Sequence, residues 1–258
     1  MHPLLCKGQH RHTASAGEML KLRLLTWDVK DTLLRLRSPV GESYSAEAQA
    51  FGLRVEAGAL SQSFRRAYEA HSKRFPNYGL DKGLSSRQWW LDVVTETFRL
   101  SGVHEERVLL PMAEKLYQDY TQTRNWELLP GARETLGQCQ GKGIRMAVVS
   151  NFDRRLQEIL VRNGLHQHFE FTLSSEDAGC AKPDRRIFLE ALRIAGVAPQ
   201  LAAHVGDHYE NDYKAAREVG MHSFLLRTAA EPAEWEMEVP KDHILPSLSC
   251  LPSLIEKG

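Results

Sequence analysis

Catalytic residue types follow four apolar runs that lie far apart in the chain. The positions are Asp28 after LLTW, Ser150 in AVVSN, Lys182 in AKPD, and Asp207 and Asp212 in HVGDHYENDY. Carboxylate oxygens suit Mg²⁺, and an aspartate can act as a nucleophile that forms an aspartyl-phosphate. A lysine ammonium and a serine hydroxyl can hold the oxygens of a transferring phosphoryl group. These residue types together indicate phosphoryl-transfer chemistry.

Five mostly apolar runs have the composition of strands that are buried on both faces of a parallel sheet. They span residues 22–27, 144–150, 169–174, 202–207 and 221–226. Helical patterns alternate with them, as in RRLQEILVRNGL, where Gly164 suits the helix end. The alternation predicts an α/β fold with a doubly wound, mostly parallel, Rossmann-like sheet. Ligands of such sheets sit beyond the carboxyl ends of the strands, where the catalytic types are expected to meet.

The stretch from residue 36 to residue 129 lacks this alternation. It holds four helical patterns in succession, SYSAEAQAFGL, AGALSQSFRRAYEAHSKRF, SSRQWWLDVVTETFRLSG and PMAEKLYQDYTQ. In the third pattern, Ser85 or Ser86 can cap the start of the helix. We therefore expect an all-helical cap at 36–129, inserted into an α/β core formed by residues 20–35 and 130–250. Residues 1–19 are expected to form a disordered leader.

Composition is that of a globular enzyme. The 258 residues are 42% hydrophobic and 26% charged, and the formal net charge is zero. A chain without net charge has no overall field that attracts nucleic acid or an anionic membrane, so neither partner is expected. No apolar run approaches the roughly 20 residues that a spanning helix needs.

The cysteines and the leader carry the prediction of location. The four cysteines are scattered without zinc-like spacing, which suits a reducing compartment and an intracellular protein of the cytoplasm or nucleus. The leader carries Lys7 and Arg11 and has no acidic residue before Glu18. A mitochondrial transit peptide is therefore the alternative. We favour a disordered leader, because the leader shows little of an Arg-rich amphipathic helix.

The motifs DVKDTLL, VVSN, KPD and GDHYEND resemble the four signature motifs of the haloacid dehalogenase-like hydrolase family. The resemblance is to the branch that carries a helical cap between the first and second motifs. It implies that Asp28 is the nucleophile and that Ser150 and Lys182 hold the phosphoryl group of a small phosphorylated molecule. Asn151, beside Ser150, joins them as a candidate substrate-binding residue. The motifs do not specify the substrate or any protein partner.

The same resemblance implies a Mg²⁺ cofactor. Its ligands would be the carboxylates of Asp28, Asp207 and Asp212 and the backbone carbonyl of Lys30. These donors are all oxygen atoms, which is the ligand set that Mg²⁺ prefers. The metal would offset the repulsion between an anionic nucleophile and an anionic substrate.

The side chain of Lys30 departs from the family pattern, which places an aspartate there as general acid and base. An unperturbed lysine has a pKa of about 10.4, and neighbouring carboxylates favour its cation, so Lys30 can donate a proton but is a poor base. Loss of general acid and base help costs about 10²- to 10⁴-fold in rate. We expect a weak or specialised phosphatase. The alternative is a catalytically silent member that binds phosphate ligands or a protein.

Halide release is a third and less favoured function, because that chemistry needs no Mg²⁺ whereas this chain keeps the acidic motif. The helical insert is expected to close over the site as a mobile cap and to select the substrate. Within it, RFPNYGLDKGL mixes Gly and Pro with Phe75 and Tyr78, and we expect this segment to face the pocket. A packed loop between helices is the alternative for the segment.

Overall fold

A computed structural model of the chain describes residues 19–227 and 237–258. The predicted leader lies outside these residues except for Met19. In the described part, the main sheet has six strands in the order β6-β5-β2-β7-β8-β9, and its neighbouring strands pair in parallel. The strands are β2 (Leu24–Trp27), β5 (Arg145–Ser150), β6 (Phe171–Ser174), β7 (Ala202–Gly206), β8 (His222–Leu226) and β9 (Ile244–Leu245). The predicted doubly wound parallel sheet is confirmed.

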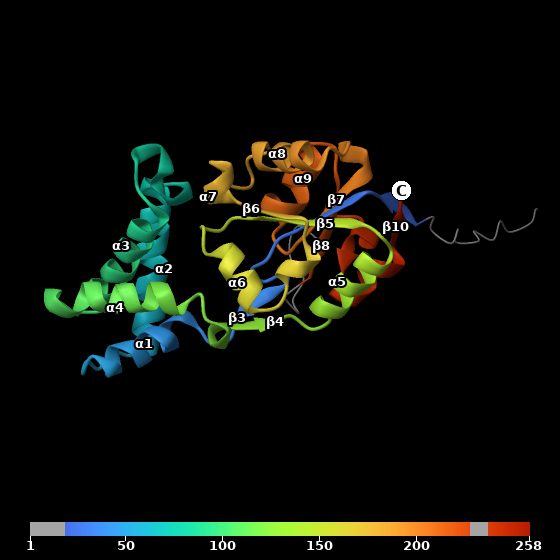
Figure 1. Cartoon of the computed structure of the whole chain (residues 1–258). Helices are drawn as coiled ribbons and strands as arrows, with labels where there is room; N and C mark the ends of the chain where they lie inside the picture. Colours follow the sequence, from blue (N-terminus) through green and yellow to red (C-terminus); the bar gives the residue numbers. More distant parts are fainter. Residues whose placement is uncertain (1–18, 228–236) are drawn as a thin grey trace, which may run out of the picture.

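Helices cover both faces of this sheet (Figure 1). The helices are α5 (Ala132–Gly141) and α6 (Leu156–Arg162) on one face, and α7 (Ser175–Ala178), α8 (Arg186–Ala195) and α9 (Ala215–Glu218) on the other. In β5, Met146 and Val148 pack with α5 and α6, while Ala147 and Val149 pack with α8 and α9. Burial on both faces explains why the strand sequences are continuous apolar runs. None of the described helices is long and apolar enough to cross a bilayer.

The cap consists of helices that lie between β3 (Leu34–Leu36) and β4 (Trp126–Leu128) in the chain. They are α1 (Val40–Ala50), α2 (Ala57–Arg74), α3 (Ser86–Leu100) and α4 (Glu106–Asp119). Strands β3 and β4 pair antiparallel where the chain leaves and re-enters the core. Figure 1 shows α1–α4 grouped beside the core, with this small sheet at the junction. The inserted helical cap is therefore present, but the interval 36–129 predicted to be all-helical also contains strand β4.

The start of α3 agrees with the sequence, whereas the start of α4 does not. Ser85 caps α3, and its hydroxyl accepts a hydrogen bond from the backbone N–H of Gln88 at 3.1 Å. Helix α4 begins at Glu106, five residues before the proline that the sequence pattern placed at its start. Pro111 lies inside the helix, where its missing N–H removes one backbone hydrogen bond. Burial of Leu109 against the cap core explains why the helix extends ahead of the proline.

The apolar run 22–27 divides into two strands that belong to different sheets. Strand β1 (Leu20–Leu22) pairs in parallel with β10 (Ile255–Lys257), and β2 begins two residues later in the main sheet. Arg23 lies at the break, where its backbone N–H donates to the carbonyl of Leu201 at 2.7 Å. The pairing of β1 with β10 joins the last described residues of the chain to the first.

Candidate active site

Four of the residues predicted to form the site meet at the carboxyl edge of the sheet. Asp28 directly follows β2, Ser150 is the last residue of β5, and Asp207 directly follows β7. These three strands are neighbours with β2 in the middle. Lys182 comes from the loop between α7 and α8. All four line one cavity of 610 Å³ that reaches from the sheet edge to the cap.

Lys182 stands at the centre of the buried charges. Its Nζ donates to Oδ1 of Asp28 at 2.7 Å, to Oδ1 of Asp212 at 2.6 Å, and to the carbonyl of Val149 at 3.0 Å. Burial alone would lower the pKa of Lys182, but the carboxylates of Asp212 and Asp28 outweigh it, and the pKa is raised. The side chain is therefore a fixed cation beside the predicted nucleophile.

Asn151 uses its side-chain amide to hold the backbone of Lys182. Its Nδ2 donates to the Lys182 carbonyl at 2.8 Å, and its Oδ1 accepts from the Lys182 N–H at 2.7 Å. This pair of bonds positions the lysine across the gap between two loops. The predicted contact of Asn151 with substrate stays a prediction. Ser150 is buried and lines the cavity, and its role toward the phosphoryl group also stays a prediction.

The carboxylates of Asp28, Asp207 and Asp212 form an oxygen cluster. One ligand atom from each lies within 4.8 Å of the others. Burial raises the pKa of Asp207 to about 7, and repulsion from Asp28 and Asp212 adds to the rise. The Thr32 hydroxyl donates to Oδ1 of Asp207 at 3.1 Å and holds that side chain in place. A divalent cation would relieve this repulsion, and an oxygen-only donor set fits Mg²⁺. The carbonyl of Lys30 stays a predicted ligand.

Asp212 is fixed from several sides. Its Oδ1 lies 3.1 Å from Nε2 of His204, whose Nδ1 lies 2.8 Å from Oγ1 of Thr26, and its Oδ2 accepts from the backbone N–H of His208 at 3.0 Å. His204 is fully buried with both ring nitrogens paired, as expected for a core histidine. A Cβ on Gly206 would lie 2.2 Å from Cγ of Asp212, so only glycine allows this close approach.

The Lys30 side chain reaches into the same cavity from the loop after Asp28. It is about half exposed, and its ammonium pairs with the carboxylate of Asp31. Burial alone would lower the pKa of Lys30, but Asp31, Asp207 and Asp28 outweigh it and raise the pKa. Lys30 is thus a cation that can donate a proton and cannot accept one. The backbone of Asp31 is left-handed, with φ of 63°, a conformation that favours glycine.

The segment 74–84, which the sequence predicts to face the pocket, directs only one of its two aromatic side chains into the cavity. Tyr78 lines the cavity, whereas Phe75 packs within the cap, with its ring centroid 4.9 Å from that of His71. Asn77 links the segment to the core, because its Nδ2 donates to the carbonyl of Ser175 at 2.9 Å. The segment therefore joins the cap to the cavity wall and to the core.

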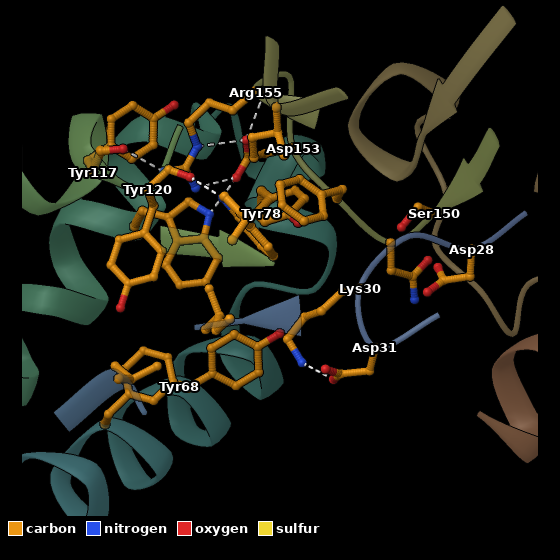
Figure 2. A pocket seen from close by; sticks show the side chains of 18 of the residues that line it. Asp28, Lys30, Asp31, Tyr68, Tyr78, Tyr117, Tyr120, Ser150, Asp153 and Arg155 are labelled. Carbon is orange, nitrogen blue, oxygen red and sulfur yellow. Dashed lines mark hydrogen bonds and ion pairs between the residues drawn. The ribbon is translucent and has the colours of Figure 1, made fainter. Parts of the chain in front are cut away.

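Sequence reasoning missed a buried ion pair that joins the core to the cap (Figure 2). Arg155 donates from Nε to Oδ1 of Asp153 at 2.9 Å and from Nη2 to Oδ2 at 2.6 Å. From the cap, Trp90 Nε1 donates to Oδ2 of Asp153 at 2.7 Å, and the carbonyl of Tyr117 accepts from Arg155 Nη1 at 2.7 Å. The run SNFDRR carries several charges, and nothing in its pattern separates the buried pair from the exposed ones.

Comparison with known proteins finds one family over most of the chain. The profile of the haloacid dehalogenase-like hydrolases matches residues 22–220. The human haloacid dehalogenase-like hydrolase domain-containing protein 3 is 57% identical over 238 residues, which cover 91% of this chain and 94% of that protein.

Solved structures share the same architecture. A dehalogenase crystal structure is 26% identical with a TM-score of 0.69, and the match covers 92% of this chain and 98% of the dehalogenase. The putative hydrolase YfnB of Bacillus subtilis, solved with magnesium, has a TM-score of 0.66 over 90% of this chain and 97% of its own. At 16% identity that likeness concerns the fold alone. From the matched profile and the human relative it follows that the chain belongs to the haloacid dehalogenase-like hydrolase family.

Proposed function

We propose that this chain is a Mg²⁺-dependent phosphatase that acts on a small phosphorylated molecule through an aspartyl-phosphate on Asp28. The observation that carries the proposal is the contact between Asp28 and the Lys182 ammonium at 2.7 Å, beside two further carboxylates, in the wall of a cavity. A nucleophilic carboxylate, a fixed cation and an oxygen cluster are what phosphoryl transfer requires.

In the first step, a carboxylate oxygen of Asp28 forms a bond to phosphorus while the bond from phosphorus to the alcohol oxygen breaks. Lys182 holds the attacking carboxylate and, together with the Ser150 hydroxyl, would neutralise charge on the phosphoryl oxygens. The raised pKa of Lys182 keeps it charged through this step. Asn151 keeps the lysine in position by its two bonds to the lysine backbone.

The residues that would hold the metal are Asp28, Asp207 and Asp212, together with the carbonyl of Lys30. Mg²⁺ when bound supplies positive charge that offsets repulsion between the anionic nucleophile and the anionic phosphate. The fit rests on the oxygen-only donors and on the burial, helped by repulsion from the neighbouring carboxylates, that raises the pKa of Asp207 to about 7. His204 and the His208 backbone keep Asp212 oriented toward this cluster.

Lys30 makes the two steps unequal. Its ammonium can give a proton to the departing alcohol oxygen, which completes the first step. Hydrolysis of the aspartyl-phosphate then needs a base that takes a proton from water. Lys30 regains a proton from solvent after the first step, and because its pKa is raised almost none of it remains as the free amine that could act as this base. The second step is therefore the slow one in this proposal.

The presence of Lys30 also favours a second candidate function. In it, the chain is a catalytically silent member of the family that binds phosphate ligands or a protein partner. Lys30, paired with Asp31, stands at the position in the chain where the family pattern has a general acid and base aspartate. A binding member would keep the Lys182 and Ser150 contacts to phosphate and would lack turnover.

One assay separates these candidates. Purified protein is incubated with p-nitrophenyl phosphate and with alkyl phosphates, with Mg²⁺ or with a chelator, and Asp28→Asn is the blank. Phosphate release that needs both Mg²⁺ and Asp28 is the result expected of a phosphatase. Phosphate binding without release supports the silent member. Release of halide from a 2-haloacid without Mg²⁺ would overturn both.

A further inference from the structure

The cavity at the proposed active site has two ends of opposite chemistry. The core end holds the charged groups around Asp28 and Lys182, and the cap end is lined by aromatic rings. Figure 2 shows Asp28 and Ser150 at one side and Tyr78, Tyr117 and Tyr120 at the other. A phosphate monoester placed with its phosphate at Asp28 therefore directs its alcohol part toward the aromatic end.

The aromatic end is built from several cap elements and one core loop. The lining rings include Tyr68 of α2, Tyr78, Trp90 of α3, Tyr117 of α4, Tyr120, and Phe152 of the core. Tyr68 and Trp90 lie 5.9 Å apart between ring centroids with their planes tilted by 38°. Aromatic rings at such spacing present faces and edges on which a planar apolar group can pack.

The charges at this end are already paired. Apart from Lys182, which serves the phosphate at the core end, the described lysines and arginines that line the cavity are Lys30, paired with Asp31, and Arg155, paired with Asp153. No described cation of these kinds is left over for a second phosphate or a carboxylate. Asp153 is likewise occupied by Arg155 and Trp90, so it has no oxygen to spare for an ammonium group. The alcohol part is therefore uncharged.

The volume of the cavity distinguishes a small uncharged alcohol from one that carries a ring system. Ligand cavities range from about 300 to about 1,000 Å³ for drug-sized molecules, and this one measures 610 Å³. A phosphorylated two- or three-carbon acid or polyol would leave the rings in contact with water. A ring system attached to one phosphate would cover them, which removes apolar surface from water.

We propose that the substrate is a phosphate monoester of an uncharged alcohol that carries an aromatic or other planar apolar ring system, bound with its ring among Tyr68, Trp90 and Tyr117. This inference rests on the proposed function only in placing the phosphate at Asp28. Binding of the ring does not need turnover, so it can be measured separately.

Phosphonates, in which carbon replaces the ester oxygen, test binding without hydrolysis. Calorimetry of the full-length protein in Mg²⁺ compares 2-naphthylmethylphosphonate with 3-hydroxypropylphosphonate, which carry the same anion. We expect the naphthyl compound to bind at least about 10-fold more tightly, from burial and ring contacts. Equal affinities, or tighter binding of the hydroxypropyl compound, would overturn the assignment.

Two variants localise the effect. Tyr68→Ala removes one cavity ring that is 41% exposed, and Phe51→Ala removes a ring of similar exposure, 36%, that does not line the cavity. We expect Tyr68→Ala to reduce the ratio of naphthyl to hydroxypropyl affinity about 3- to 10-fold, which corresponds to the free energy of one aromatic contact. Phe51→Ala should leave this ratio unchanged. Equal effects of the two variants would show that the ring does not sit at Tyr68.

Measurements of turnover test the aromatic site separately from the phosphatase activity. Benzyl phosphate and glycerol 3-phosphate both release a primary alcohol, so leaving-group chemistry contributes little to the comparison. A higher kcat/KM for benzyl phosphate supports the aromatic site, whereas equal values with Mg²⁺-dependent turnover would overturn it and leave the phosphatase standing. Naphthyl binding without any turnover would support the aromatic site and contradict the phosphatase.

Discussion

The ammonium nitrogen of Lys182 lies 2.7 Å from a carboxylate oxygen of Asp28, although 154 positions separate the two residues in the chain. The contact exists because β2 and β5 are neighbours whose carboxyl ends share one edge, and because Asn151 at the end of β5 anchors the lysine backbone. A second bond at 2.6 Å joins the same ammonium to Asp212. The buried cation thus connects the nucleophile to the carboxylate cluster.

The first prediction concerns the metal. Asp207→Ala removes an oxygen from the cluster of three carboxylates, and Mg²⁺ affinity measured by calorimetry should fall at least about 10-fold, the lower end of what even outer partners of a metal contribute. Glu210→Ala is the control, because Glu210 is exposed and pairs with Lys214 on the same short helical segment. Undiminished affinity in Asp207→Ala would remove Asp207 from the site.

The second prediction concerns the close packing of Gly206 on Asp212. In Gly206→Ala the new methyl group would lie 2.2 Å from Cγ of Asp212, so the aspartate must move. We expect weaker Mg²⁺ binding and a loss of about 1–3 kcal/mol in the free energy of unfolding, as for other overpacked sites. Gly137→Ala in α5 meets open space and should leave Mg²⁺ binding unchanged. Unchanged Mg²⁺ affinity and an unchanged free energy of unfolding in Gly206→Ala would contradict the predicted close packing.

The third prediction concerns the buried pair between core and cap. Arg155→Met leaves the Asp153 carboxylate buried without its cation, which should lower the free energy of unfolding by about 3–5 kcal/mol in urea denaturation. Replacing Asp153 by Asn in the same protein should recover part of that loss. Arg186→Met, at an exposed pair with Asp184, serves as the control and should leave stability unchanged within error. Equal losses from Arg155→Met and Arg186→Met would show that the cap does not depend on this pair.

The parts of the fold that the sequence predicts are those with strong local patterns. The continuous apolar run of 144–150 identifies β5, because both faces of that strand are covered by helices. The catalytic types could be assigned to one site because they follow such runs, and parallel strands end at one edge. The residue type and its place before a helical pattern predict a cap at Ser85 or Ser86, and the structure has it at Ser85.

Other parts depend on contacts that no local pattern records. Strands β3 and β4 have three residues each, too few for a periodic signal, and they form only because the chain returns to the core after the cap. The pairing of Trp90 with Asp153 spans 63 positions, and an aromatic stripe on a helix predicts packing and not its polar partner. The sequence pattern predicts the start of α4 at Pro111 because proline favours a helix start, whereas tertiary packing of Leu109 extends the helix ahead of Pro111.

The fourth prediction concerns Lys30. Lys30→Asp supplies a carboxylate that can act as acid and base, and should raise turnover of an alkyl phosphate by about 10-fold or more, a floor below the usual effect of general catalysis. An aryl phosphate needs less protonation of its leaving group, so its first step should gain less. The exchange of a cation for an anion beside the cluster should also tighten Mg²⁺ binding.

Two controls accompany this change. Asp28→Asn in the Lys30→Asp protein should abolish the gain, because the nucleophile is lost. Lys30→Met removes the cation without adding a base and should not raise turnover. If Lys30→Asp binds Mg²⁺ and remains inactive on a broad panel of phosphates, the missing base is not the limiting defect, and the binding function takes precedence.

The most direct test of the proposed chemistry is whether phosphate becomes attached to Asp28. The protein with Mg²⁺ is mixed with p-nitrophenyl phosphate, quenched in acid within the first turnovers, and digested for mass spectrometry. Since Lys30 is a poor base, the aspartyl-phosphate should accumulate on the peptide that contains Asp28, and Lys30→Asp should lower its level at equal or higher turnover. Turnover without a phosphorylated Asp28 peptide, or phosphate attached to another residue, would contradict Asp28 as the nucleophile.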